Sequence, residues 1–483
     1  MSATVPYPWP AGCREVVATL HEGSPEAGRV IGTPHHRATD DFLAVDFSPS
    51  LRALVHQVGE RASSVGRAFS ARIREDPRNP FSAGIEVTPA ERAAGLDRTI
   101  RITTEDPAAA ERLAHLLVAS GLAESSHPVV AQIVQTPHQA AFVELPTEQP
   151  GSWAFHCVHG DEALDLEPGD PEVVVGVLDT GIDGTHPEFA GKLVSGYNFV
   201  EFPPDTPGLV GHVTTRGTDT TDDAGHGTHV AGVIGARGLK MHRGLAGNCK
   251  LMSVRVLGTT EEYGQRVGIG IVQDIDDGLK YAVDQGVRVV NMSLGMHALG
   301  PGLPHQRAIE YAHLNDVVCV AAAGNDGTSQ AVYPGDLPGV LTVGAITELN
   351  QVAPFSSWGP FLDVTAPGVS IYSTDRGGGY RYRIGTSHAA PLVTAVAALL
   401  CARARRHGFM LRERTVRRII RDTADNPGTR RTDLKAGAGC LNALDAVLML
   451  SHLMRDRLSQ NRWMNAPDDA RLDHIRVPVG TGS

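Results

Sequence analysis

In Val173-Val-Val-Gly-Val-Leu-Asp179-Thr-Gly181, a run of mostly β-branched apolar residues leads directly into a carboxylate. The apolar residues are continuous rather than alternating with polar ones, which predicts a short strand buried on both faces, as in a parallel sheet. Functional side chains gather at the carboxyl ends of the strands in such sheets. The stretch therefore predicts a parallel α/β sheet with Asp179 at its functional edge.

Similar apolar runs recur after about residue 150 and alternate with stretches of helical periodicity. The predicted strands cover residues 173–178, 251–256, 287–292, 317–323 and 340–343, and the predicted helices cover 227–236, 270–285, 306–314 and 387–405. Strands that alternate with helices in this way indicate parallel strands joined by crossover helices. We therefore predict an α/β fold with a doubly wound, mostly parallel sheet.

Two further motifs supply an imidazole and a hydroxyl. His226 lies between two glycines, and Ser387 begins a predicted helix. A hydroxyl is a weak nucleophile at neutral pH, so it needs a base, and the base needs a group that holds its tautomer. Asp179, His226 and Ser387 are these three residue types. Pro391 is expected in the first turn of the helix, where backbone N–H groups have no helical partner.

These residues follow the order aspartate, histidine, serine, and their motifs resemble those of the subtilases: Asp179-Thr-Gly181, Gly225-His-Gly-Thr-His229 and Gly385-Thr-Ser387. A fourth segment, Ala321-Ala-Ala-Gly-Asn325, resembles the subtilase oxyanion-hole motif. The resemblance extends over about residues 153–450 and implies a subtilisin-like serine endopeptidase that hydrolyses peptide bonds through an acyl-enzyme. It implies that Asn325 stabilises the oxyanion, and that the chemistry needs no cofactor.

The resemblance also implies which residues bind the substrate. Ser293, Leu294 and Gly295 would pair with the substrate backbone as an added strand. Ala323, Gly324 and Gly335 would surround the pocket for the side chain that precedes the cleaved bond.

Two features near this pocket favour different substrates. Val332 would fill part of the pocket and favour modest side chains. Asp326, with Glu261 and Glu262 on a neighbouring loop, would instead select basic groups by charge. The sequence leaves this choice open, and both features favour selectivity over general digestion.

Two departures from the subtilase pattern concern the active site and a calcium site. His388 follows the serine where family members commonly have methionine, so the rate and the pH optimum are open while the reaction type is not. Many subtilases hold calcium with an acid soon after the catalytic aspartate, a position that Glu188 would occupy here. The accompanying loop, residues 236–244, is cationic and poor in oxygen ligands, which a Ca²⁺ ion needs, so no metal site is predicted.

Composition limits the function classes. The chain has 483 residues and a formal charge of −11, which argues against nucleic-acid binding. The longest apolar run, near residues 392–402, is too short to span a membrane, and residues 1–17 lack a signal-peptide pattern, so an intracellular, cytoplasmic location is expected. The six cysteines include no Cys-x-x-Cys pair. We expect reduced thiols, with Cys319 and Cys401 buried and inert.

The chain is too long for one ordinary core. We predict an N-terminal α+β domain over residues 1–150, a subtilisin-like catalytic domain over 151–450 and a polar surface tail over 451–483. In the first domain a strand over 99–104 and a helix over 108–120 are predicted, and residues 129–134 and 140–145 could add strands. This domain is either a propeptide, which would make the chain a zymogen cleaved near residues 145–152, or an accessory domain.

The resulting functional hypothesis is a selective intracellular processing protease that acts on a peptide or protein precursor. Two alternatives remain: a transpeptidase or macrocyclase that passes the same acyl group to an amine, and a non-catalytic peptide-binding module. The partner is a peptide or protein in every case. The sequence does not predict an oligomeric state.

Overall fold

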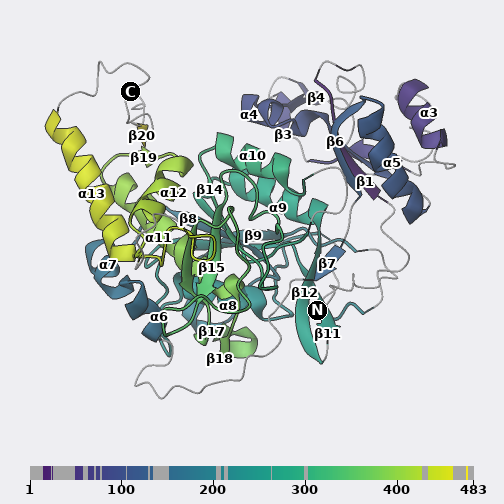
Figure 1. The fold of residues 1–483 in the computed structure, drawn as a ribbon. Helices are drawn as coiled ribbons and strands as arrows, with labels where there is room; N and C mark the ends of the chain where they lie inside the picture. Colours follow the sequence, from purple (N-terminus) through teal and green to yellow (C-terminus); the bar gives the residue numbers. More distant parts are fainter. Residues whose placement is uncertain are drawn as a thin grey trace.

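The computed structural model describes residues 15–22, 24, 49–57, 64–69, 72–76, 79–104, 106–128, 131–133, 152–202, 208–211, 216–262, 264–297, 303–426, 433–460 and 475–476. A seven-stranded parallel sheet lies at the centre, in the order β16-β15-β14-β13-β8-β10-β9 (Figure 1). Its strands are β8 (Val174–Asp179), β9 (Leu193–Asn198), β10 (Lys250–Arg255), β13 (Val289–Met292), β14 (Val318–Ala322), β15 (Leu341–Ile346) and β16 (Val364–Pro367). The predicted doubly wound parallel sheet is confirmed.

Helices cover both faces of this sheet, and the side chains of each strand alternate between them. On β14, Val318 and Val320 pack with α8 (His226–Gly235) and α11 (Thr386–Arg406). Cys319 and Ala321 pack on the opposite face, in the cluster that contains α9 (Val272–Asp284) and α10 (Gln306–Leu314). Burial on both faces explains why these strands are continuous apolar runs in the sequence.

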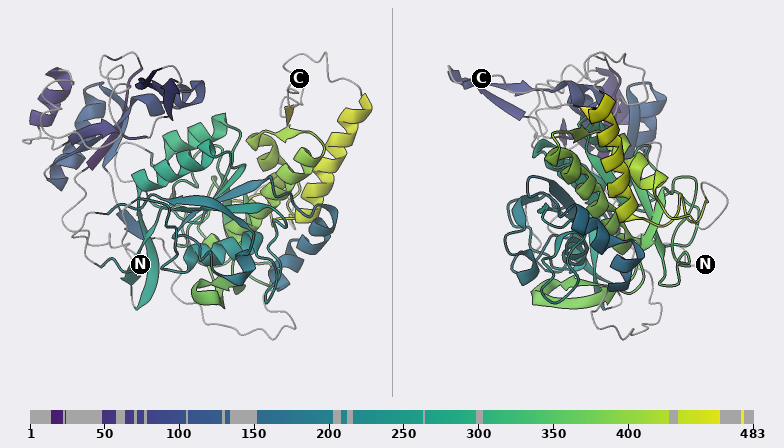
Figure 2. Two further views of the ribbon diagram at one scale, coloured as in Figure 1. Left: turned by 180° about the vertical axis from the view of Figure 1, so that it is seen from behind. Right: turned by 90° about the vertical axis from the view of Figure 1, so that its left-hand side faces the viewer.

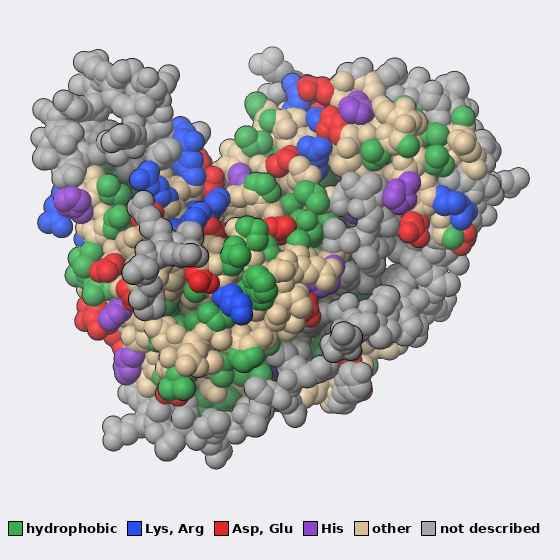
Figure 3. Space-filling view, in the orientation of Figure 1, with side chains coloured by type: hydrophobic (Ala, Val, Ile, Leu, Met, Phe, Trp, Pro, Cys, Tyr) green, Lys and Arg blue, Asp and Glu red, His purple; other side chains and the backbone are tan. Residues whose placement is uncertain are grey.

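Shorter elements surround the central sheet and the helices that cover it. They are α6 (Ser152–Cys157), α7 (Gly160–Leu166), η2 (Pro187–Phe189), η3 (Arg376–Gly378), α12 (Glu413–Asp422), α13 (Ala443–Gln460), the hairpins β11 (Gly258–Glu262) with β12 (Gln265–Ile271) and β17 (Ile371–Asp375) with β18 (Gly379–Arg383), and the pair β19 (Met410–Leu411) with β20 (Ile475–Arg476). Helix α13 continues beyond Leu450, so part of the predicted tail is helical. Helix α12 buries Val416, Ile419 and Ile420, and basic side chains lie over it on the surface (Figure 3).

Helix α11 is the one helix of the described residues that is long and apolar enough to cross a membrane. In this structure 94% of its apolar window is buried inside the protein. It therefore serves as the central helix of the core, in contact with β13, β14, β15 and β16.

The N-terminal residues form a separate α+β unit around a four-stranded sheet with the order β2-β5-β1-β6. Its elements are β1 (Glu15–Leu20), α3 (Pro49–Gln57), β2 (Ser64–Arg67), β3 (Arg72–Asp76), β4 (Asn79–Glu86), α4 (Pro89–Ala93), η1 (Leu96–Arg98), β5 (Thr99–Thr103), α5 (Pro107–Ala119) and β6 (Ala123–Pro128). The next strand, β7 (Ala131–Ile133), instead joins the hairpin of β11 and β12. The strand predicted at 99–104 and the helix predicted at 108–120 are β5 and α5. The predicted strand at 140–145 lies outside the described residues.

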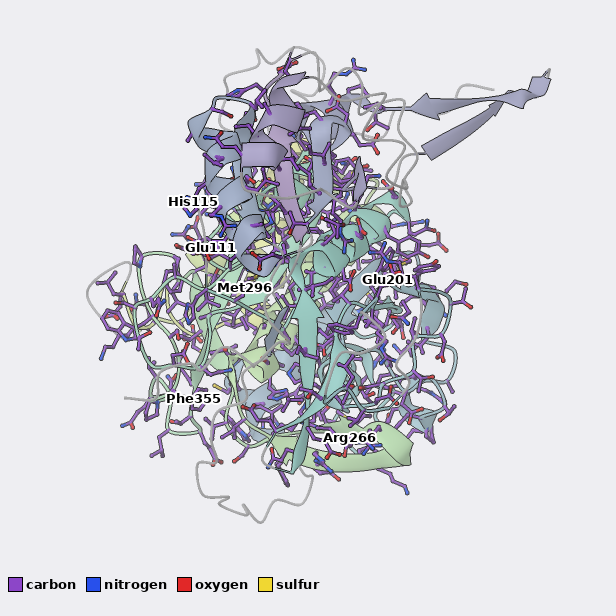
Figure 4. All side chains as sticks on the ribbon, turned by 90° about the vertical axis from the view of Figure 1, so that its right-hand side faces the viewer. Glu111, His115, Glu201, Arg266, Met296 and Phe355 are labelled. Atoms are coloured by element: carbon purple, nitrogen blue, oxygen red, sulfur yellow. The ribbon has the colours of Figure 1, made fainter. Side chains whose placement is uncertain are left out.

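This N-terminal unit docks on α9 and α10, away from α13 (Figure 2). Phe69, Ala94 and Leu96 join the apolar cluster of the two helices. Beside them, Lys280 Nζ on α9 lies 2.7 Å from Glu91 Oε1, and both side chains are at most 5% exposed. Figure 4 shows α5, with Glu111 and His115, above the part of the chain that carries Met296 and Phe355. The contact is apolar at its centre and contains a buried ion pair.

Candidate active site

The predicted aspartate and histidine meet at the carboxyl edge of the sheet. Asp179 is the last residue of β8, and His226 is the first residue of α8. His226 Nδ1 lies 2.7 Å from Asp179 Oδ1, and both side chains are almost fully buried. Asp179 Oδ1 also accepts a hydrogen bond from Thr180 N–H. A carboxylate bound to Nδ1 holds the imidazole with its Nε2 available as a base.

A second aspartate, which the sequence analysis missed, joins these two motifs. Asp222 Oδ1 accepts hydrogen bonds from the Thr180 hydroxyl at 2.8 Å and from Gly225 N–H at 2.7 Å. Its Oδ2 accepts from Thr228 N–H and Oγ–H, in the first turn of α8. The carboxylate is therefore placed at the positive end of the helix. The signal in the sequence was an acid shortly before a predicted helix start.

Ser387 is the second residue of α11, as the motif predicts. The expectation for Pro391 was wrong, because α11 begins at Thr386 and Pro391 lies inside the helix. A proline has no N–H to bond the carbonyl four residues before it, which is that of Ser387. The hydroxyl of Ser293 donates to this carbonyl at 2.7 Å. Ser293 thus compensates the proline and fixes the backbone of Ser387.

Asn325 follows β14 and lies against the start of α11. Its Oδ1 accepts hydrogen bonds from Thr386 N–H at 2.9 Å and from Thr386 Oγ–H at 3.0 Å. Because the oxygen end of the carboxamide faces Thr386, the Nδ2 end is directed away from it. A side-chain amide held in this way beside the Ser387 backbone is an arrangement suited to an oxyanion hole.

The serine and the histidine are not hydrogen-bonded in this structure. Ser387 Oγ donates to the Ser293 carbonyl oxygen at 3.2 Å. His226 Nε2 is buried without a hydrogen-bond partner. Catalytic hydrogen bonds are often loose before a substrate binds, and a rotation of the Ser387 side chain would direct its hydroxyl away from the Ser293 carbonyl.

Two more histidines pack behind His226. The ring of His388 lies 4.5 Å from that of His229 and 5.4 Å from that of His226, between centroids. His229 Nε2 contacts the carbonyl oxygens of Ile371 and Arg381. Burial holds the pKa of both His229 and His388 well below the usual value of a histidine, and neighbouring positive charges lower it further. Both rings are therefore neutral near pH 7.

Two of the residues predicted to bind substrate contact the start of α11: Ser293 bonds Ser387, and Gly324 N–H donates to Thr386 Oγ at 3.2 Å. Ser293, Leu294 and Gly295 follow β13, and Ala323 and Gly324 follow the neighbouring strand β14. Ser293 contacts Ser387 directly, as described above. Gly335 lies in a closely packed position, where an added Cβ would meet Thr342 Cγ2 at 3.1 Å and the Val332 carbonyl oxygen at 3.1 Å.

One edge of the β11–β12 hairpin is paired with a strand from the N-terminal part of the chain. Strand β7 pairs antiparallel with β12, with Ala131 opposite Ile271 and Ile133 opposite Ile269. The strand predicted near residues 129–134 is therefore present. An extended segment added to a sheet edge is a common mode of peptide recognition.

The acid that the subtilase pattern assigns to calcium has other partners here. Glu188 is fully buried, and its two carboxylate oxygens accept hydrogen bonds from the backbone N–H groups of Gly238, Leu239 and Lys240 at 2.7–3.0 Å. The Tyr380 hydroxyl donates a further bond at 3.1 Å. Because the donors point at these oxygens, the residues form an anion-binding loop and do not fit a cation.

Comparisons with known proteins agree with this geometry. Residues 170–439 match the subtilase family. The thermophilic serine proteinase of Bacillus sp. (strain AK1) is 36% identical over 289 residues, which are 59% of this chain and 64% of that protein. Thermitase of Thermoactinomyces vulgaris is 33% identical over 56% of this chain and 86% of its own length.

A solved protease structure from Pseudoalteromonas arctica PAMC 21717 shares 28% identity, with a TM-score of 0.54, over 62% of this chain and 98% of that chain. The sequence match, the parallel sheet and the aspartate–histidine pair at its edge all point to one family. The chain belongs to the subtilase family of serine proteases.

Proposed function

We propose that this chain is a serine endopeptidase in which Ser387 Oγ attacks the carbonyl carbon of a peptide bond. His226 Nε2 takes the serine proton and then gives it to the leaving amine. Asp179 holds His226 in the required tautomer and stabilises the imidazolium. Asn325 and the Ser387 N–H stabilise the negative charge on the carbonyl oxygen. Water then releases the acyl group from Ser387.

The observation that carries this proposal is the buried contact of 2.7 Å between His226 Nδ1 and Asp179 Oδ1, next to α11, the helix that carries Ser387 in its first turn. A buried imidazole bonded to a carboxylate on one side, with its other nitrogen unpartnered, is the arrangement of a general base.

The test compares the parent chain with Ser387→Ala on a peptide library and with a serine-directed fluorophosphonate. We expect hydrolysis and labelling by the parent and neither by the variant. Hydrolysis that survives the substitution would refute the mechanism. Mass spectrometry of the products separates hydrolysed ends from ligated or cyclic species, which a transpeptidase would form.

We further propose that the N-terminal domain is a propeptide that keeps the enzyme a zymogen. The pairing of β7 with β12 and the docking on α9 and α10 support this. We expect one cleavage near residues 145–152 that is lost in Ser387→Ala, measured as intact mass. A fully active chain that keeps its N-terminus would identify an accessory domain instead.

We propose limited processing of a peptide or protein precursor, rather than general digestion, as the role of this activity. The narrow surroundings of Gly295 and Gly324, where an added Cβ would lie 2.5 and 2.9 Å from the Val332 side chain, support it. The proposed intracellular location is tested separately, by fractionating cells that produce the chain and detecting it in the cytoplasm or outside.

A further inference from the structure

Cys157, at the end of α6, and Cys440, on the segment that leads into α13, lie side by side, and we propose that they form a site of reversible oxidation. A low-molecular-weight disulfide such as oxidised glutathione would convert the pair into a disulfide bond. That bond would fasten the first helix of the catalytic domain to the segment before its last helix. The inference goes beyond the proposed protease function and does not depend on it.

The two sulfur atoms are already in contact. Cys157 Sγ and Cys440 Sγ are 3.9 Å apart, although the two residues are 283 positions apart in the chain. A disulfide bond is about 2 Å long, so the sulfur atoms must approach each other by roughly 2 Å. Cys157 is partly exposed, and its side chain therefore has room to turn.

Hydrogen bonds hold the backbone on both sides of the pair. Cys440 exchanges two of them with Asp425, at 2.7 and 2.9 Å. Ala443 N–H, at the start of α13, donates to the carbonyl oxygen of Val158 at 2.8 Å. Val158 follows Cys157 directly and is fully buried. The bond would thus close between two segments that are already joined.

Cys157 is the thiol that reacts first in this proposal. Among the cysteines that the structure describes, it alone is partly exposed, and the other four are buried. The hydrogen bond from Cys440 outweighs burial and lowers the pKa of Cys157. The same contact, together with burial, raises the pKa of Cys440. Because a thiolate is the attacking species in thiol–disulfide exchange, Cys157 attacks the oxidant and Cys440 resolves the intermediate.

The exchange takes two steps. The Cys157 thiolate attacks one sulfur of oxidised glutathione, forms a mixed disulfide and expels one glutathione thiolate. Cys440 then loses its proton to solvent, attacks Cys157 Sγ and expels the second glutathione thiolate. The protein loses two thiol hydrogens, and the oxidant becomes two molecules of reduced glutathione. The pair would stay reduced in a reducing compartment and close in an oxidising one.

A disulfide at this place would secure the amino end of the catalytic domain. Helix α6 follows the proposed cleavage near residues 145–152, and Figure 1 shows α6 and α7 beside the start of α13. Without the disulfide, α6 is held by noncovalent contacts: Trp153 Nε1 donates to the Ser370 carbonyl at 3.3 Å, and the buried Phe155 stacks on His242. A cross-link that closes so long a loop also restricts the unfolded chain.

The experiment uses the full chain with Ser387→Ala, which prevents self-cleavage. The protein is incubated with oxidised glutathione, and its intact mass and its peptides are measured without reduction. We expect the mass to fall by two hydrogen atoms, and one cross-linked peptide to contain Cys157 and Cys440. Dithiothreitol should restore both thiols. In Cys440→Ser one glutathione should remain on Cys157, because nothing resolves the mixed disulfide, and in Cys157→Ser the cross-link should be absent.

Digestion by chymotrypsin at raised temperature measures the effect on stability. The oxidised protein should lose its intact catalytic domain at least about tenfold more slowly than the reduced protein, because cleavage follows the population of opened molecules. Cys401→Ala is the matched control, since this cysteine is 5% exposed and lies in the core. It should keep the cross-link and the protection. Circular dichroism checks that each variant is folded.

Three results would overturn the inference: a parent chain that gains no cross-link, a cross-link that survives in Cys157→Ser, or equal digestion of the oxidised and reduced proteins. None of them bears on the proposed protease function, because every protein in the experiment carries Ser387→Ala.

Discussion

Replacing Glu188 by alanine tests whether this buried carboxylate takes the structural place of a cation. Its oxygens accept four backbone hydrogen bonds from the loop residues Gly238, Leu239 and Lys240, and one from the Tyr380 hydroxyl. Burial and this carboxylate raise the pKa of Tyr380 to about 12, so its hydroxyl stays a donor at neutral pH. We expect Glu188→Ala to destabilise the protein without changing the catalytic groups.

The magnitude follows from the donors that lose their acceptor. A buried donor left without a partner costs about 1–3 kcal/mol. Residues 237–240 are exposed, so water replaces part of the loss and the lower end applies to each of the three N–H groups. The expected loss is about 3 kcal/mol in the free energy of unfolding. For a domain of about 300 residues, with an unfolding entropy of about 2.1 cal/mol/K per residue, that corresponds to a fall in Tm of roughly 5 °C.

The assay is thermal denaturation in a Ser387→Ala background, which prevents self-cleavage. Glu172→Ala is the control, because this glutamate is 68% exposed and should change Tm by no more than about 1 °C. A chelator should leave the Tm of the Glu188 protein unchanged. The reasoning fails if Glu188→Ala melts like the control, or if added Ca²⁺ raises Tm only when Glu188 is present.

Three other outcomes are expected. Asn325→Ala should lower kcat by about 10²- to 10³-fold with little change in KM, because an oxyanion donor acts in the transition state. Steady-state kinetics measures both constants, and a rise in KM as large as the fall in kcat would contradict that role. His229 and His388 stay neutral in the folded protein, but in the unfolded chain they take up protons below about pH 6.5. Below that pH the free energy of unfolding therefore falls by up to ~1.4 kcal/mol per pH unit for each histidine. Acid unfolding followed by circular dichroism should therefore move to lower pH in His388→Met, and an unchanged midpoint would argue against it. Cys157 Sγ lies 3.9 Å from Cys440 Sγ, and a hydrogen bond from Cys440 lowers the pKa of the Cys157 thiol. Oxidised glutathione should therefore join the two cysteines in a disulfide and raise Tm. The rise in Tm should be absent in Cys157→Ser.

The sheet was predictable where both faces of a strand are buried. Strands β8 and β14 are nearly continuous apolar runs, and β10 and β13 are apolar with a few polar residues, such as Ser253 and Asn291. The edge at which their carboxyl ends meet follows from the parallel arrangement. Strands β9 and β16 were not predicted, because edge strands are partly exposed or short and carry residues such as Gly196 and Pro367. The spacing of apolar residues does not distinguish such strands from loops.

The proximity of Asp179 and His226 at the sheet edge was predictable from local motifs, whereas the groups that support these candidate residues were not. Asp222 and the Ser293 hydroxyl act through contacts between segments that are distant in the chain, and no spacing rule connects them. The same holds for Cys157 and Cys440, which the sequence analysis treated as unrelated thiols. Glu188 was identified as an acid of interest, but its partners are backbone N–H groups, which any sequence provides.

The hydrogen bonds of Asp222 and Ser293 divide the active site into two preassembled halves. One half contains Asp179 and His226 and is fastened by Asp222; the other contains Asn325 and Ser387 and is fastened by Ser293. A rotation of the Ser387 side chain would release its hydroxyl from the Ser293 carbonyl, and the hydrogen bonds that hold each half would stay in place. We therefore expect an arriving peptide to meet groups whose positions are already fixed, so that binding reorders little of the surrounding protein.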